Sequence, residues 1–135
     1  MASRHKFLAA ATAGVWIVGS EFARNELLFK HLWVGHFSTL GLRFETLPLN
    51  GMLWTVWGFA LGYLVAALLG RFSFGEAVFL AWLAAFPMMW LTLHNLQVLP
   101  PGLLVAAIPL SVVEVVVAAA IVRKLTKGPP QPRPS

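Results

Sequence analysis

Glu114 is the residue of this sequence with the clearest chemical potential, because it stands alone inside a long apolar segment. That segment covers 102–123, and Glu114 is the single charged residue in its interior. A charged side chain inside a membrane is costly and by default indicates a functional site. Ser111 and the small residues Ala107 and Ala118 share its helical face, so this face is expected to meet protein rather than lipid. Glu114 could handle a proton or cation, hydrogen-bond a neighbouring helix, or contact a partner subunit.

A second polar group follows the first apolar segment. Glu21 precedes Arg24 by three positions and Asn25 by four, and both spacings bring side chains together on a helix. With the N-terminus on the inner side, a rise of about 1.5 Å per residue places this group in the outer half of the membrane. It is either a structural ion pair or part of a binding site.

Further polar residues are expected at the same depth. Asn50 begins the second apolar segment, and His94 and Asn95 end the third. We therefore expect a small outward-facing polar pocket with an acidic floor, although His94 could equally be an ordinary interfacial side chain. The expected site residues are Glu21, Arg24, Asn25, Asn50, His94, Asn95, Ser111 and Glu114.

The composition is that of a membrane protein. Of the 135 residues, 59% are hydrophobic and 11% are charged, whereas a soluble domain is nearer half apolar and a quarter charged. The absence of Cys excludes disulfides and thiolate chemistry. Phosphate-binding loops, zinc-protease motifs, nucleophile elbows and basic-aromatic nucleic-acid surfaces are also absent from the sequence. We expect no cofactor, no metal site and no nucleic-acid partner, and the bilayer as the surrounding partner.

The apolar runs predict an all-α, polytopic membrane protein. About 20 apolar residues cross a bilayer as a helix, and spans are expected at about 6–23, 51–70, 76–96 and 102–123 in a single membrane domain, 1–127. The expected architecture is a four-helix transmembrane bundle. The long first loop, 24–49, is expected to be partly helical and interfacial on the outer side, and the Pro-rich tail, 128–135, to be disordered.

The first span has an alternative interpretation. Its basic start and short apolar run also resemble the charged and apolar regions of a signal peptide. Against that alternative, Glu21 occupies the minus-three position of a cleavage site after Ala23, where a small residue is needed. We therefore expect a helix that continues beyond Ser20.

The basic residues predict the orientation. In a four-span arrangement one side carries Arg4, Lys6, Arg71, Arg123, Lys124, Lys127 and Arg133. The other side carries Arg24, Lys30 and Arg43. Because Lys and Arg accumulate on the cytoplasmic side, both termini are expected in the cytoplasm.

Small residues recur at helical spacing where helices could pack closely. Without a hydrophobic drive inside lipid, close backbone approach supports association. The stripe could serve packing within the chain or a homo-oligomer. The expected packing residues are Gly58, Gly62, Ala66, Gly70, Ala81 and Ala85.

Two stretches carry a resemblance to known proteins. They are Ser20-Glu21-Phe22-Ala23-Arg24-Asn25 with its continuation to Lys30, and Pro48-x-Asn50-Gly51 followed by His94-Asn95-Leu96. With them the chain resembles uncharacterised small four-span bacterial inner-membrane proteins. The resemblance implies a bacterial inner-membrane helical protein and no particular activity. The chain does not match fluoride channels, and it departs from small multidrug transporters, whose essential Glu lies near the middle of the first span.

These observations leave three functional hypotheses. The first is a module that binds or transports a small cation, proton or lipophilic molecule through the polar pocket. The second is an accessory or assembly subunit of a larger membrane complex, for which Glu114 and the glycine stripe are packing devices. The third is a membrane enzyme acting on a lipid-soluble substrate, and it ranks last because no matched acid–base pair is visible.

Overall fold

The computed structural model describes residues 2–127, and every element in this part of the chain is helical. The elements are α1 (Ala2–Phe22), the π-helix η1 (Ala23–Leu28), α2 (Lys30–Thr39), α3 (Pro48–Leu69), α4 (Phe74–Ala85), α5 (Pro87–Asn95) and α6 (Leu103–Thr126). The expected all-α class is thus confirmed for the described residues. The segment 128–135, expected to be a disordered tail, lies outside them.

Three helical segments within residues 2–127 are long and apolar enough to cross a membrane. They are Pro48–Leu69, Phe74–Asn95 and Leu103–Thr126, the second of which joins α4 and α5. These segments identify a membrane protein. The helix α1 has 21 residues but does not meet the same criterion, because Lys6 near its start and Glu21 near its end lower its hydropathy.

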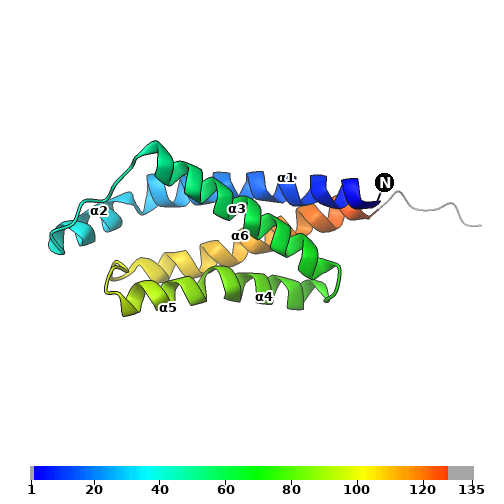
Figure 1. Ribbon diagram of the computed structural model, residues 1–135. Coiled ribbons are helices and arrows are strands. Elements are labelled where there is room, and N and C mark those ends of the chain that lie inside the picture. Colours follow the sequence, from blue (N-terminus) through cyan, green and yellow to red (C-terminus); the bar gives the residue numbers. More distant parts are fainter. Residues whose placement is uncertain (1, 128–135) are drawn as a thin grey trace, which may run out of the picture.

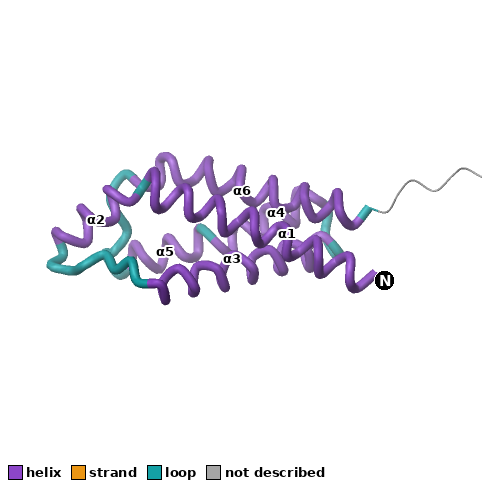
Figure 2. The backbone as a smooth tube through the Cα atoms, turned by 90° about the horizontal axis from the view of Figure 1, so that it is seen from above, coloured by secondary structure: helices purple, strands orange, loops and turns teal. Residues whose placement is uncertain are grey.

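The long helices lie alongside one another, as Figure 1 shows. The helix α1 contacts α3 and α6, and α4 contacts the same two helices. The view from above in Figure 2 places most connections at the two ends of the molecule. The N-terminus lies at the end where α6 finishes, while α2 projects beyond the other end.

The α4–α5 segment is interrupted at Phe86. The sequence predicted one continuous span here, so this interruption was not anticipated. Phe86 has φ −106° and ψ −63°, and Pro87 begins α5. The proline ring disfavours helical backbone at the preceding residue and supplies no N–H donor. Phe86 is nevertheless fully buried, so the interruption places a large aromatic ring at the centre of the molecule.

The closest backbone approach joins α1 and α3. A Cβ atom on Gly62 would lie 2.6 Å from the carbonyl oxygen of Ala10 and 2.7 Å from the backbone N of Gly14. At Gly58 it would lie 2.6 Å from Cγ2 of Val18. Only glycine allows the helices to pack this closely at Gly62, because the obstructing atoms are backbone.

The other expected packing residues occupy varied positions. Ala81 and Ala85 are buried on α4, and Ala66 is half-buried on α3. Gly70 is exposed and caps the C-terminus of α3. Of the expected packing residues, Gly58 and Gly62 contact α1 of the same chain, as the distances above show.

The first loop is helical in η1 and α2 and has no regular secondary structure in 42–47. Trp33 stacks on Phe44 with ring centroids 6.0 Å apart, and Phe37 meets both rings edge-on. Nε2 of His36 lies 3.0 Å from the carbonyl oxygen of Gln97. These contacts hold the loop together and join it to the connection between α5 and α6.

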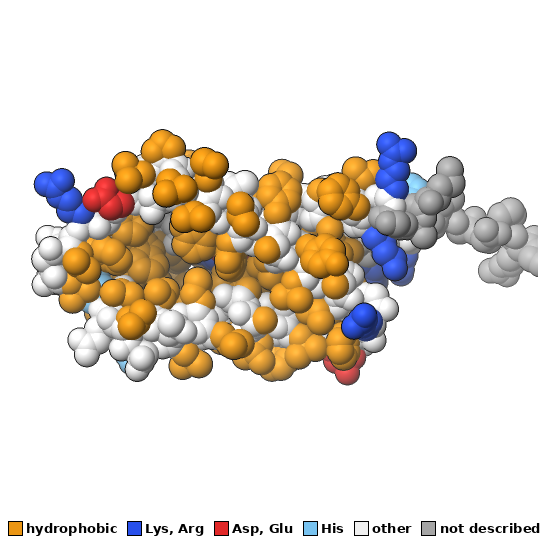
Figure 3. Space-filling model, viewed as in Figure 1, with side chains coloured by type: hydrophobic (Ala, Val, Ile, Leu, Met, Phe, Trp, Pro, Cys, Tyr) orange, Lys and Arg blue, Asp and Glu red, His pale blue; other side chains and the backbone are white. Residues whose placement is uncertain are grey.

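The surface is apolar along its length and charged at its ends. Figure 3 shows hydrophobic side chains over the middle of one face, with Lys and Arg side chains gathered at both ends. Large exposed hydrophobic residues occur on every long helix, including Phe7, Val56, Leu91 and Val105. Such a surface suits lipid contact around the molecule.

Candidate functional site

Glu114 is buried at the midpoint of α6, with a side chain directed to α1 and η1. It is 1% exposed. The hydroxyl of Ser20 donates to its Oε2 at 2.7 Å, and Nη2 of Arg24 lies 3.5 Å from the same oxygen. A span of 24 residues rising about 1.5 Å per residue places this carboxyl roughly 17 Å from either end of the helix. The acidic group is thus enclosed by protein at the greatest depth that α6 offers.

Arg24 is the cation of this cluster, and a π-helical turn carries it. The backbone N–H of Phe29 donates to the carbonyl oxygen of Arg24 at 2.9 Å, five residues apart. The wider turn of η1 changes the direction of the residues that follow α1, and such turns often occur at functional sites. Arg24 is only 6% exposed. Its Nη2 pairs with both Glu21 and Glu114.

The ring of Phe86 lies under this guanidinium. The Cζ atom of Arg24 is 5.0 Å from the ring centroid, a distance typical of a cation–π contact. Phe86 comes from the interruption between α4 and α5. The proline-induced break therefore has a direct role in holding Arg24.

Glu21 and Asn25 complete the polar cluster on the α1 side. The side-chain amide of Asn25 donates to Oε2 of Glu21 at 2.7 Å, and Nε1 of Trp33 donates to Oδ1 of Asn25 at 3.2 Å. Glu21 is buried like Arg24. With two carboxylates and one guanidinium, the fully ionised cluster has a formal charge of −1. A proton on one of the two carboxylates would balance this charge.

Two atoms of the cluster have no hydrogen-bond partner among the described residues. They are Nη1 of Arg24 and Oε1 of Glu114, and both are buried. A buried polar atom without a partner costs about 1–3 kcal/mol, and more when it is charged. The cluster therefore leaves one donor and one acceptor unused in close proximity.

A groove between α1–η1 and α6 opens beside these two residues. It has a volume of about 560 Å³ and contains Arg24 and Glu114 in its lining. Most of the remaining wall is apolar, formed in part by Val15, Leu28, Leu110 and Val113, all of which are exposed on the outer surface. The volume lies within the range of small-molecule sites. The arrangement combines an apolar wall with a charged floor.

Ser111 is not part of the groove lining and contacts α4 instead. Nε1 of Trp82 donates to its hydroxyl at 2.9 Å, and this hydroxyl donates to the carbonyl oxygen of Ile108 at 2.8 Å. Ser111 is fully buried. Its observed contacts are those of a helix-packing residue joining α4 to α6.

The structure does not bring every expected site residue together. Glu21, Arg24, Asn25 and Glu114 form the cluster described above. Asn50 is exposed in the first turn of α3, and His94 and Asn95 are exposed at the end of α5. Their side chains make no hydrogen bond to the cluster within residues 2–127.

Sequence reasoning missed Ser20, Trp16, Phe86 and the role of Trp33. One signal was available, since Trp16, Ser20 and Arg24 recur at steps of four and so share a helical face. Nε1 of Trp16 donates to the carbonyl oxygen of Glu114 at 3.0 Å, next to the Ser20 contact. Phe86 had no comparable signal, because its place depends on how α4 packs in the folded chain.

Neither a protein-family model, nor a curated protein, nor a solved structure matches this chain. The resemblance to small four-span bacterial membrane proteins therefore stays an expectation. The geometry of the cluster and its groove is the basis on which a function can be assigned.

Proposed function

We propose that this protein binds a lipophilic small molecule with a polar head in the groove between α1 and α6. The setting we propose is a bacterial inner membrane crossed four times, with α1 as the additional span and both termini in the cytoplasm. Basic residues at the end where α1 begins outnumber those at the other end, in accord with the positive-inside rule.

The surface of α1 supports its assignment as a span. Its residues Phe7, Leu8, Val15 and Phe22 are large, apolar and exposed. Exposed side chains of this kind are costly in water and suited to lipid. Because α1 packs along two helices that are long enough to cross, it is expected to share their depth.

The observation that carries the proposed activity is the pair of unused polar atoms beneath the apolar groove. Both atoms are enclosed, so side chains around them must move for an occupant of the groove to reach them. An occupant that then accepts from Nη1 of Arg24 and donates to Oε1 of Glu114 would satisfy both. A hydroxyl group does this, because it offers one donor and two acceptor lone pairs. The occupant that fits is therefore a long-chain or polycyclic alcohol whose apolar part lies along Val15, Leu28, Leu110 and Val113.

A small cation fits this site less well than an alcohol. The guanidinium of Arg24 already lies 3.5 Å from Oε2 of Glu114, where a cation would bind. A second positive charge there would be repelled by the first. The lipophilic ligand is thus favoured over cation transport, and proton handling by Glu114 remains compatible with it.

Quenching of Trp16 fluorescence tests the proposal, because this indole lines the groove. The probes are a brominated long-chain alcohol and the corresponding brominated alkane, added to the protein in lipid nanodiscs. The signal of Trp16 is the difference between wild type and Trp16→Phe. We expect quenching by the alcohol to saturate. Quenching by the alkane should instead rise in proportion to the amount of probe in the lipid.

Glu114→Gln is the matched variant. It loses the charged acceptor, and a hydrogen bond to a charged group contributes about 1.5–3 kcal/mol, so the alcohol should bind on the order of 10- to 100-fold more weakly. Glu26→Gln is the control, because Glu26 pairs with Lys30 outside the groove. Equal quenching by alcohol and alkane, or an unchanged alcohol affinity in Glu114→Gln, would refute the proposal.

The second proposed function, an accessory subunit of a membrane complex, rests on the same apolar walls. A helix of a larger partner could cover Val15 and Val113, which are 62% and 56% exposed. Val113→Trp should then abolish copurification with that partner at fixed stoichiometry. If the chain is recovered alone from native membranes and still binds the alcohol, the subunit function is excluded.

A further inference from the structure

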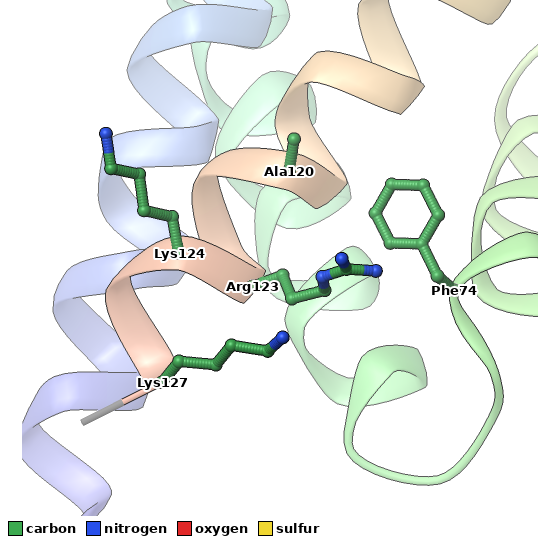
Figure 4. Close-up of a pocket in the computed structure, with 5 residues that line it drawn as sticks. All are labelled: Phe74, Ala120, Arg123, Lys124 and Lys127. Carbon is green, nitrogen blue, oxygen red and sulfur yellow. The ribbon is translucent and has the colours of Figure 1, made fainter. Parts of the chain in front are cut away.

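A second cavity lies at the end of the molecule where α6 finishes and α4 begins. It has a volume of about 380 Å³ and is lined by Phe74, Ala120, Arg123, Lys124 and Lys127. Figure 4 shows that the three basic side chains leave the C-terminal end of α6, with Arg123 and Lys127 directed toward the side of Phe74 and Lys124 directed away from it. The cavity is far along α6 from Glu114 and belongs to a different part of the structure.

The three cations have no acidic partner in the described chain. The ion pairs present within residues 2–127 use Arg24 and Lys30 as their cations. The nearest acidic residue along α4, Glu76, is instead engaged by Ser73, whose backbone N–H donates to it at 3.0 Å. The charges of Arg123 and Lys127 thus lie together at this cavity, with Lys124 nearby on α6, and none of the three has an acidic partner within residues 2–127. Uncompensated positive charge of this kind indicates an anionic occupant.

Arg123 has a defined position in this cavity. Its Cζ atom lies 4.9 Å from the centroid of the Phe74 ring, so the aromatic face holds the guanidinium. Figure 4 shows Arg123 and Lys127 reaching toward the side on which Phe74 lies. A planar guanidinium held in this way offers paired donors that match phosphate oxygens. Ala120 leaves the space above it open, because its side chain is a single methyl group.

Exposed apolar side chains lie on α4, the helix that begins at the cavity with Phe74. Phe79 and Leu83 are exposed, lie four residues apart and therefore share a helical face. Such a surface beside a basic cavity suits the two parts of a lipid, an anionic headgroup and its acyl chains. Soluble anions would use the basic residues but gain nothing from this apolar face.

The geometry points to a binding site for the phosphate-bearing headgroup of an anionic membrane lipid, formed by Arg123, Lys124 and Lys127 around Ala120. Phe74 positions Arg123, and the acyl chains lie along Phe79 and Leu83. The inference is independent of the groove between α1 and α6, because it uses different residues and a different cavity.

Native mass spectrometry of the full chain in detergent micelles tests this site. Dioleoylphosphatidylglycerol is the anionic probe, dioleoylphosphatidylcholine the zwitterionic comparison, and inorganic phosphate the soluble competitor. We expect wild type to prefer phosphatidylglycerol and inorganic phosphate to displace it poorly. Because each cation near a membrane surface contributes about 5-fold, Arg123→Gln/Lys124→Gln/Lys127→Gln should bind it on the order of 10- to 100-fold more weakly.

The matched control removes the same number of charges at the same end of the molecule. Arg4→Gln/Lys6→Gln/Arg71→Gln should stay within about 3-fold of wild type, because these residues do not line the cavity. Ala120→Phe keeps every charge and fills the cavity, so it should also lose the preference for phosphatidylglycerol. Size-exclusion elution and helical circular dichroism check that each variant is folded.

Three results would overturn the inference. Equal losses in the two triple variants would show that only the diffuse positive field matters. An unchanged preference in Ala120→Phe would show that the cavity is not the site. Full displacement of phosphatidylglycerol by millimolar inorganic phosphate would assign the cavity to a soluble anion instead of a lipid.

Discussion

Arg24 contacts two buried carboxylates, so its replacement should lower the free energy of unfolding more than removal of the charge of either acid. In Arg24→Met, Glu21 and Glu114 both lose their cation while remaining enclosed. Removing one partner of a buried ion pair costs about 3–5 kcal/mol. We expect a loss of that size in the free energy of unfolding, although methionine fills a similar volume.

Glu114→Gln should cost far less. The glutamine oxygen can still accept from Ser20, which donates at 2.7 Å in the wild-type protein. Arg24 keeps its contact with Glu21 and its place over Phe86. What is lost is the contact of 3.5 Å between the charges of Arg24 and Glu114, for which we expect about 1 kcal/mol.

The double variant Arg24→Met/Glu114→Gln separates the contributions. Removing the charge of Glu114 takes away one of the two uncompensated carboxylates, so the double variant should recover roughly half of the loss in Arg24→Met. Because Glu114→Gln alone costs about 1 kcal/mol, this is a coupling of about 2.5–3.5 kcal/mol, at the upper end of the range for residues in one network. Lys30→Met is the control, because the Lys30–Glu26 pair is solvent-exposed and worth about 0–1 kcal/mol.

The assay is unfolding in mixed micelles with increasing mole fraction of dodecyl sulfate, followed by circular dichroism. The four variants are compared by their midpoints at constant slope. Equal losses in Arg24→Met and Glu114→Gln, or strictly additive effects in the double variant, would refute the idea that Arg24 stabilises both acids.

Three further predictions concern packing and orientation. Gly62→Ala should destabilise the protein by about 1–3 kcal/mol, because its Cβ meets backbone at 2.6 Å; Gly19→Ala, with nothing within 4 Å, should be neutral or stabilising in the same unfolding assay. Phe86→Leu should cost about 0.5–2 kcal/mol through the lost cation–π contact, and an unchanged midpoint would deny that contact a role. Reporter fusions at the C-terminus and in the loop at Arg71 should both report cytoplasm; a periplasmic signal from either would reverse the proposed orientation.

The long helices were predictable from the sequence because the length of each apolar run is enough to indicate a helix. The runs that begin near Asn50 and Gly102 are too long and too apolar for any other element in a chain of this composition. The break at Phe86 and the π-helical turn after Phe22 were not anticipated. Both depend on backbone geometry that packing stabilises, and the π-helical turn leaves no distinct pattern in residue type.

The candidate site was predictable only in part, for a geometric reason. Helical spacing brings Glu21, Arg24 and Asn25 together, since all three belong to one continuous helical stretch. The helical rise placed Asn50 and His94 at the same depth in the membrane. Depth alone does not say which side chains face one another. The rotation of each helix about its axis and the choice of its neighbours follow from side-chain packing. These factors leave Asn50 and His94 at the exposed ends of α3 and α5.

The pairing of Glu21 with Arg24 has a consequence for the order in which the protein is made. Synthesis proceeds from the N-terminus, so Arg24 is complete long before Glu114, which lies 94 residues beyond Ser20. During that interval Glu21, three residues away on the same helical stretch, can already neutralise the guanidinium. Glu114 has no such neighbour on α6, where the next cation is Arg123 near the far end. The last helix of the described chain therefore carries an acid whose cationic partner is made before it, and the pairing of Glu114 with Arg24 favours one rotation of α6 about its axis.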